Sequence, residues 1–306
     1  MRSNRPQGPA RRSGLGSRKL ARWAVLPIGL AVAIVLAGCT GQQLTGYLPA
    51  DPDTTNQTSR VIGLWVTSWI VLLGVGVVTW GLIIWAAVVY RRRKGQTGLP
   101  VQLRYNLPIE IFYTIVPLIL IIGFFAFTAR DQEQIERDPG NPDVQIEVFG
   151  KRWSWDFNYL DENVYSAGIQ AQERLNGDGT IDEDRLPVLY LPVDKKVQID
   201  IESRDVAHSF WIINFLYKKD MIPAQTNHWY FIPQKIGSYQ GKCAELCGEY
   251  HADMLFRVEV VSQEDYDAYI ESLRDAGNEG RLGPEYNTNS NLPGTDGRTT
   301  NEDQGE

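Results

Sequence analysis

Four residues able to bind a metal fall within a short segment near the C-terminal end of the chain. Residues 243–254 read CAELCGEYHADM. The four residues are Cys243, Cys247, His251 and Met254. His208, one of only 3 histidines in the chain, precedes them. Thiolate and thioether sulfur are soft ligands that select copper together with imidazole, and two thiolates can also bridge two metal ions. The segment therefore predicts a redox copper site.

Three alternatives compete with copper. A disulfide between Cys243 and Cys247 is plausible in an exported domain, but it gives no role to His251 or Met254. A structural zinc ion would accept two cysteines and two histidines, yet it has no use for a thioether. The residues could also be ordinary members of a core. Copper alone uses the whole set.

Together with the segment 205–210, DVAHSF, the pattern Cys-x-Glu-x-Cys-x-x-x-His-x-x-Met resembles cytochrome c oxidase subunit II. The resemblance extends over residues 60 to 274, apart from 160–187. A second stretch, DMIPAQTN at 220–227, resembles the family's Asp-x-Ile-Pro-Gly-Arg-x-Asn, with Ala-Gln in place of Gly-Arg. The resemblance implies two membrane spans and an outer cupredoxin domain with a dinuclear copper centre, CuA.

The resemblance also implies a role for individual residues. It assigns copper binding to His208, Cys243, Glu245, Cys247, His251 and Met254. The two thiolates would bridge the copper ions, each imidazole would bind one ion through nitrogen, and the thioether would bind through sulfur. Glu245 would offer its backbone carbonyl to copper. Its carboxylate would reach a magnesium ion at the boundary with the catalytic subunit.

An aromatic stretch marks the place where electrons are expected to enter. Residues 151–159 read KRWSWDFNY, with an aromatic at every second position from Trp153. Spacing of two places these side chains on one face of a strand. The three later aromatics are expected in the core. Trp153 begins the strand, and the family's Trp-x-Trp segment implies that it receives electrons from cytochrome c, although Ser154 stands where the family usually has an aromatic.

A single carboxylate, Glu110, lies near the start of the second long apolar run. An ionisable residue inside a membrane is a functional candidate by default, although an acid near the end of a span could also be an interfacial residue. The stretch EIFYTIVP at 110–117 resembles the family's Glu-x-x-Trp-Thr-x-x-Pro, with Tyr113 replacing Trp. The resemblance favours a role at the start of a proton path into the catalytic subunit.

Two long apolar runs must anchor these residues in a membrane, the first without any charge and the second with Glu110 as its one acid. Residues 61–90 and 107–129 are each long enough to span a hydrocarbon core of ~30 Å as a helix. The loop 91–106 between them begins RRRK and holds no acid. The positive-inside rule assigns this loop to the cytoplasm. The N-terminal segment 39–60 and everything after the second span are then expected outside.

The first 38 residues have the form of a bacterial export signal. A basic region without acids precedes an apolar stretch that ends Leu36-Ala37-Gly38-Cys39. This ending resembles a lipobox, in which Cys39 would become the lipidated first residue of the mature chain. The alternative is an uncleaved anchor with an incidental cysteine.

The outer part, residues 130–274, has the period-two pattern of strands. The expected strands are 144–149, 153–159, 188–193, 197–202, 209–213, 228–232 and 254–261. Residues 160–187 are expected to be a loop insertion. Ser262 and Asp265 predict a helix to about residue 274. Residues 275–306 are polar and acidic, and are expected to be disordered.

The predicted fold is therefore a membrane-anchored all-β protein, with a two-helix transmembrane hairpin and an outer cupredoxin-like β-sandwich or barrel. With 30 basic and 37 acidic residues, the net charge of −7 excludes binding to nucleic acid through bulk charge. The resemblance implies a subunit of the bacterial cell membrane that accepts electrons from a soluble or tethered cytochrome c. It would pass them to haem in a catalytic subunit, which reduces oxygen and pumps protons alongside other oxidase subunits.

Three rival functions remain. A quinol oxidase subunit II would share the fold but lack the copper ligands. A copper-containing nitric oxide reductase subunit would differ only in its partners. A membrane-tethered copper carrier would need a labile site, which the multi-ligand motif and Glu110 disfavour.

Overall fold

The computed structural model describes residues 40–99, 102 and 104–283. The chain divides into a unit ending at Tyr47 and a second unit beginning at Leu48. In the first unit the described residues form the short helix α2 (Gly41–Leu44), where Thr40 and Gln43 make a capping box. The expected signal peptide 1–38 and Cys39 lie outside the described residues.

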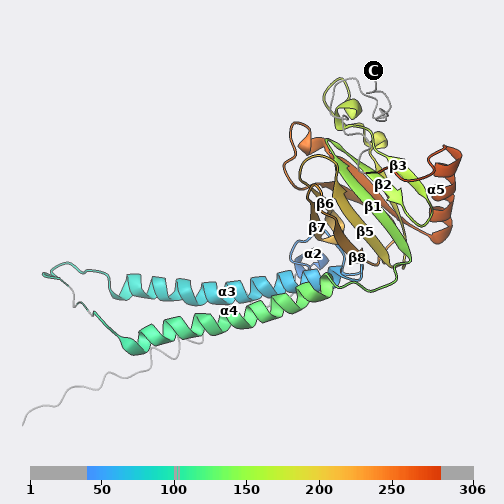
Figure 1. The fold of residues 1–306 in the computed structure, drawn as a ribbon. Coiled ribbons are helices and arrows are strands. Elements are labelled where there is room, and N and C mark those ends of the chain that lie inside the picture. The colour runs from blue at the N-terminus through green and yellow to red at the C-terminus, as the bar shows by residue number, and fades with distance from the viewer. Residues whose placement is uncertain (1–39, 100–101, 103, 284–306) are drawn as a thin grey trace, which may run out of the picture. The chain divides into compact units, whose positions relative to one another are not determined.

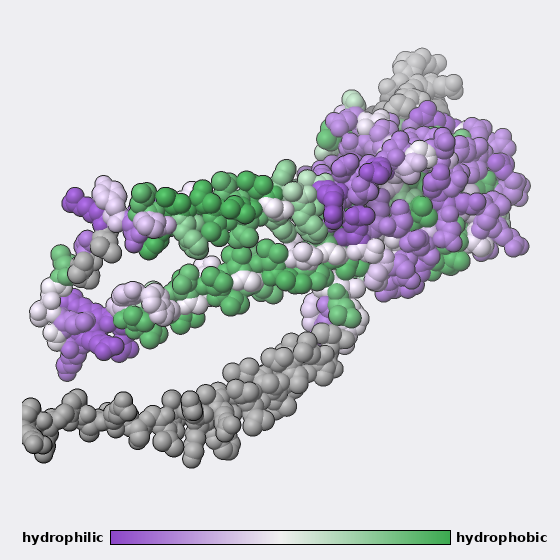
Figure 2. All heavy atoms as spheres, turned by 90° about the horizontal axis from the view of Figure 1, so that it is seen from below, coloured by the Kyte–Doolittle hydropathy of each residue, from purple (hydrophilic) through white to green (hydrophobic). Residues whose placement is uncertain are grey.

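Two long helices begin the second unit. Helix α3 (Thr58–Val89) has 32 residues and α4 (Leu107–Ile135) has 29. Both are long and apolar enough to cross a membrane. Apolar side chains cover most of their outer surface, whereas the β domain that follows is mainly hydrophilic (Figure 2). Asn106 caps α4 by accepting a hydrogen bond from the Ile109 amide at 3.4 Å.

Within the described residues, the β domain has ten strands. Figure 1 shows how they follow the two long helices. Their bounds are β1 (Val144–Lys151), β2 (Ser154–Tyr159), β3 (Val164–Ala167), β4 (Val188–Pro192), β5 (Val197–Ser203), β6 (His208–Ile212), β7 (Tyr217–Met221), β8 (Asn227–Phe231), β9 (Gly237–Cys243) and β10 (Leu255–Val261). They build two five-stranded sheets, in the orders β3-β2-β1-β5-β8 and β4-β10-β9-β6-β7. The pairs β1–β5 and β4–β10 are parallel and the other pairs are antiparallel. This two-sheet domain after two apolar helices confirms the predicted fold class.

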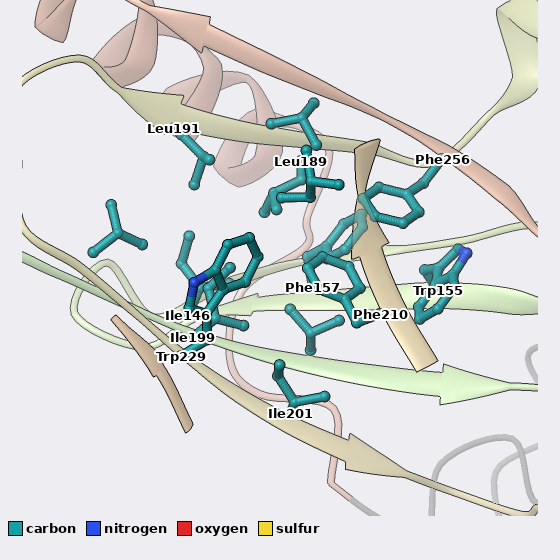
Figure 3. Close-up of a cluster of buried hydrophobic side chains, with 14 of the residues drawn as sticks. Ile146, Trp155, Phe157, Leu189, Leu191, Ile199, Ile201, Phe210, Trp229 and Phe256 are labelled. Atoms are coloured by element: carbon teal, nitrogen blue, oxygen red, sulfur yellow. The ribbon is translucent and has the colours of Figure 1, made fainter. Parts of the chain in front are cut away.

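The core lies between the two sheets. Strands β5 and β10 alternate buried and partly exposed positions, as expected for strands with one face inward. The inward side chains from both sheets meet in one cluster (Figure 3). Trp155 and Phe157 are fully buried in this cluster, as the aromatic pattern predicts.

Contacts join the helices to the β domain at the ends of α3 and α4. The side-chain amide of Gln57 donates to the backbone carbonyls of Ile135 at 2.9 Å and Tyr230 at 2.7 Å. Lys219 on β7 forms an ion pair of 2.5 Å with Glu136, the residue after α4. These bonds connect the domain to the end of the helical hairpin at which α3 begins and α4 ends.

All seven expected strands are present, whereas β3, β7 and β9 were not predicted. The expected loop insertion 160–187 contributes β3 and the 3-10 helices η1 (Ala171–Arg174) and η2 (Glu183–Arg185). Helix α5 (Gln263–Asp275) is capped by Ser262 as predicted, and contacts β3 and β4.

The prediction of disorder from residue 275 is wrong for residues 276–283. Leu282 is buried, and its amide and carbonyl both bond the side chain of Asn158. Arg281 forms an ion pair with the buried Glu147. Paired polar groups therefore fix this segment to the sheet. The rest of the expected tail, 284–306, lies outside the described residues.

Candidate metal centre

One end of the second sheet and the loop after β9 carry the predicted ligands. His208 is the first residue of β6 and Cys243 is the last residue of β9. These strands are antiparallel neighbours, with Phe210 opposite Cys243, so the first histidine and the first cysteine come together. His251 opens the 3-10 helix η4 (His251–Asp253), and Met254 follows just before β10.

The structure brings all six predicted copper-binding groups into one cluster around two sulfur atoms. The Sγ atoms of Cys243 and Cys247 are 3.9 Å apart. Each thiol has its own neighbours. Cys243 Sγ lies 3.7 Å from His208 Nδ1 and 3.2 Å from the Glu245 carbonyl oxygen.

The second thiol, Cys247, completes the cluster. Its Sγ lies 3.5 Å from His251 Nδ1 and 3.7 Å from Met254 Sδ. Both cysteines are free thiols, so the structure does not contain the disulfide that was an alternative. Each sulfur is thus surrounded by its own imidazole and a further donor, an arrangement suited to two bridged ions.

Two neighbouring thiols that are both buried are difficult to deprotonate together. His208 and Met254 are fully buried, and Cys243 and Cys247 are nearly so. A hydrogen bond from Cys247 lowers the pKa of Cys243 to about 3, against the opposing effect of burial. The pKa of Cys247 is correspondingly raised, first by its bond to Cys243 and then by burial. For both thiols to lose their protons at this separation, a cation must lie between them, which is the chemistry of a metal site.

The imidazole of His208 is held from two sides. Its Nε2 lies 2.8 Å from Asp205 Oδ1, which leaves Nδ1 directed at Cys243. Burial alone would lower the pKa of His208, but hydrogen bonds to Asp205 and Cys243 raise it. Gly150 on β1 leaves room for the ring, because a Cβ there would lie 3.1 Å from His208 Cδ2. Asp205 and Gly150 were not predicted as functional residues, although the position of Asp205 three residues before a ligand was a usable signal.

Trp153 precedes β2 and contacts the cluster. Its indole Nε1–H donates to the backbone carbonyl of Cys247 at 3.2 Å. The side chain is 9% exposed, and its ring stacks edge-on against Tyr250 at 5.0 Å between centroids. Gly248, with φ of +120°, lies against the same ring, where a Cβ would be 3.2 Å away. Trp153 is therefore a largely buried member of the core cluster that bonds the backbone of a predicted ligand residue.

The carboxylates of the two other predicted residues, Glu245 and Glu110, are not part of the cluster. The carboxylate of Glu245 is on an exposed residue, while its carbonyl points at Cys243. Glu110 lies in the first turn of α4, where its Oε1 accepts a hydrogen bond from the Asn106 amide at 2.9 Å. This bond gives Glu110 a local helix-capping contact. His228, to which no function was assigned, lies outside the cluster and pairs with Asp200 at 2.7 Å.

Comparisons with known proteins agree on one family. The family model for "Cytochrome C oxidase subunit II, periplasmic domain" matches residues 144–261. The probable cytochrome c oxidase subunit 2 of Streptomyces avermitilis is 38% identical over 278 residues, covering 82% of this chain and 87% of that protein. The cytochrome c oxidase subunit 2 of Mycobacterium tuberculosis H37Rv is 32% identical over 322 residues, covering 89% and 86%. The solved periplasmic domain of cytochrome oxidase subunit II from Bradyrhizobium japonicum is 28% identical, with a TM-score of 0.39 over 44% of this chain and 96% of that one.

Proposed function

This chain belongs to the cytochrome c oxidase subunit II family, and we propose that its cysteine–histidine–methionine cluster holds the dinuclear copper centre CuA. The chain is the subunit through which electrons enter a terminal oxidase, and it is a membrane protein of a haem-copper oxidase complex. When bound, copper supplies one-electron redox chemistry.

A single observation carries the copper proposal. Two buried thiols 3.9 Å apart are each flanked by a separate imidazole nitrogen and one further donor. The further donors are the carbonyl oxygen of Glu245 and the thioether of Met254. One structural zinc ion would need four ligands and would leave the thioether unused. Two thiolates able to bridge, with soft sulfur and imidazole around them, suit two copper ions.

The protein around the cluster would hold the ligand atoms in one arrangement and exclude water. His208 and Cys243 come from paired strands of one sheet, which limits their relative motion. His208 is further fixed by the carboxylate of Asp205, and the backbone of Met254 by the indole of Trp155 at 3.4 Å. A rigid ligand set changes shape little when it gains or loses an electron, as fast electron transfer requires.

Trp153 is the proposed point at which electrons from cytochrome c enter. The support is its hydrogen bond to the Cys247 carbonyl, together with its small exposed edge beside Tyr250. The indole would thus connect a docked donor to the residue that contributes a bridging thiolate. Cytochrome c is the proposed donor, and haem in the catalytic subunit is the proposed acceptor.

Glu245 and Glu110 are proposed to serve the boundary with the catalytic subunit. The backbone carbonyl of Glu245 faces the cluster, and the residue itself is exposed to solvent. We propose that its carboxylate binds magnesium at that boundary. Glu110 lies in the first turn of a membrane helix, at the position expected for the start of a proton path.

The proposed location is a bacterial cell membrane with the β domain on the outer face. The basic residues 91–94 begin directly after Tyr90, the C-cap residue of α3, and favour a cytoplasmic loop. Cys39 is the proposed lipidated N-terminus, and intact mass spectrometry should show a mature chain that begins there and carries acyl groups. An unmodified chain that starts at Met1 would contradict this processing.

Metal analysis of the purified oxidase complex tests the copper proposal. The variant Cys247→Ser should lose two copper ions per complex relative to the wild type. The matched control His228→Asn removes a histidine outside the cluster and should keep both. One zinc ion per chain, or unchanged copper in Cys247→Ser, would overturn the proposal.

A further inference from the structure

The inserted segment 160–187 places a buried guanidinium beside the ligand loop. Arg174 is the last residue of η1 and is only 1% exposed. Its Nη2 donates to the backbone carbonyl of Asp253 at 3.1 Å. Asp253 lies directly before Met254 and two residues after His251, both proposed copper ligands. Among the described residues, Nε and Nη1 of Arg174 have no hydrogen-bond partner.

The same segment is fixed to the residue through which electrons are proposed to enter. The amide of Ala171, the first residue of η1, donates to the Trp153 carbonyl at 3.1 Å. The Trp153 amide donates to Gln170 Oε1 at 2.5 Å, and Gln170 is buried. After η1, the Asp182 amide donates to the Arg174 carbonyl at 2.9 Å. Hydrogen bonds on both sides of Arg174 in the sequence therefore hold the backbone that carries its side chain.

Arg174 keeps its positive charge in this setting. Burial lowers its pKa to about 10, while the Asp253 carboxylate opposes that shift and Arg185 adds to it. The side chain is therefore protonated at neutral pH. A buried charge without full compensation is costly, so a neutral side chain would serve better if packing were the only requirement.

We propose that Arg174 is a positioning residue that tunes the metal centre: its bond to Asp253 holds the ligand loop, and its buried charge favours the reduced state. A positive charge opposes the extra positive charge of the oxidised centre, and little water screens it in the interior. This inference rests on the proposed copper function and assigns a role to the inserted segment.

The test compares three variants of the purified oxidase complex. Arg174→Gln removes the charge, Arg174→Lys keeps it, and Arg185→Gln removes an exposed charge from the same segment as a matched control. Copper content is measured first, and the centre is then titrated against ambient potential by electron paramagnetic resonance. In the copper-depleted complex, hydrogen exchange of residues 250–256 reports on the loop without any metal.

We expect Arg174→Gln to lower the reduced-to-oxidised ratio at fixed potential on the order of tenfold, or ~59 mV for one electron. Arg174→Lys and Arg185→Gln should stay near the wild type. Exchange of the loop should be faster in Arg174→Gln than in Arg185→Gln. These outcomes together support both parts of the proposal.

Other outcomes overturn it. An unchanged potential in a copper-loaded Arg174→Gln removes the effect of the charge, as does an equal shift in Arg174→Lys. If Arg174→Gln binds no copper, the potential of Arg174→Lys decides: a wild-type value supports the charge, and a lowered value or lost copper refutes it. Absence of copper from the wild type would instead defeat the proposed function, while the exchange measurement would still test the loop contact.

Discussion

Replacing Asp205 with asparagine should weaken copper binding strongly, because three N–H groups converge on its carboxylate. Oδ1 lies 2.8 Å from His208 Nε2 and 2.6 Å from the Val206 amide nitrogen. Oδ2 accepts from the Arg152 amide at 2.7 Å. Asparagine has one acceptor oxygen, so its NH₂ group would face one of these donors.

The size of the effect follows from these contacts. A hydrogen bond to a charged group contributes about 1.5–3 kcal/mol, and an outer partner of a ligating histidine typically changes metal affinity by about 10- to 100-fold. In Asp205→Asn, His208 Nε2 faces either a neutral amide oxygen or an NH₂ group in place of a carboxylate, and because His208 is fully buried, water cannot replace the lost interaction. We therefore expect Asp205→Asn to weaken copper binding by about 10- to 100-fold.

A chelator competition titration of the oxidase complex measures this change. Asp200→Asn is the matched control, because Asp200 is a partly buried carboxylate that pairs with a histidine outside the cluster, His228, at 2.7 Å. Its copper affinity should equal that of the wild type. If Asp205→Asn and Asp200→Asn bind copper equally well, the carboxylate does not hold the ligand and the reasoning fails.

Three further changes test other parts of the account. Trp153→Phe should slow electron transfer from cytochrome c far more than it weakens docking; stopped-flow reduction checks this, and a changed copper spectrum would make Trp153 a packing residue instead. Glu110→Gln keeps an oxygen that can accept from the Asn106 amide, so α4 should be intact while oxygen turnover falls; normal turnover would remove the proton role. Gly150→Ala should destabilise the copper-free protein by about 1–3 kcal/mol through its contact with the His208 ring, and an unchanged thermal midpoint would show that the ring can move.

The metal cluster could be predicted because its residue types are rare in this chain and nearly contiguous in the sequence. Five of the six groups lie within residues 243–254, and the sixth, His208, is one of 3 histidines. The two apolar helices could also be predicted from the sequence. Their runs of nearly uncharged residues are longer than a helix in the core of a soluble protein usually requires.

Strands β7 and β9 escaped prediction because their sequences do not look apolar. Strand β9 reads GSYQGKC and β7 reads YKKDM, with several polar or exposed positions. Gly241 on β9 is required by packing, since a Cβ there would lie 2.1 Å from the Phe256 ring. Tertiary contacts rather than local propensity therefore define these strands.

The role of the inserted segment was hidden for a different reason. Its acidic, glycine-containing sequence is typical of a surface loop, and nothing local indicates that Arg174 is buried against Asp253, far along the chain. The backbone conformation of Ala224 could not be read from the local sequence either. The family has glycine in the matching motif, and Ala224 adopts a left-handed φ of +62°, which glycine would adopt without strain.

The central claim is that electrons reach the oxidase through the cluster of this subunit. Rapid mixing of reduced cytochrome c with the oxidase complex, with haem reduction followed optically, tests it most directly in Cys247→Ser. We predict that cytochrome c no longer reduces haem in this variant, while a small chemical reductant still does. Haem reduction by cytochrome c at the wild-type rate, in a complex shown to lack the two copper ions, would contradict the claim.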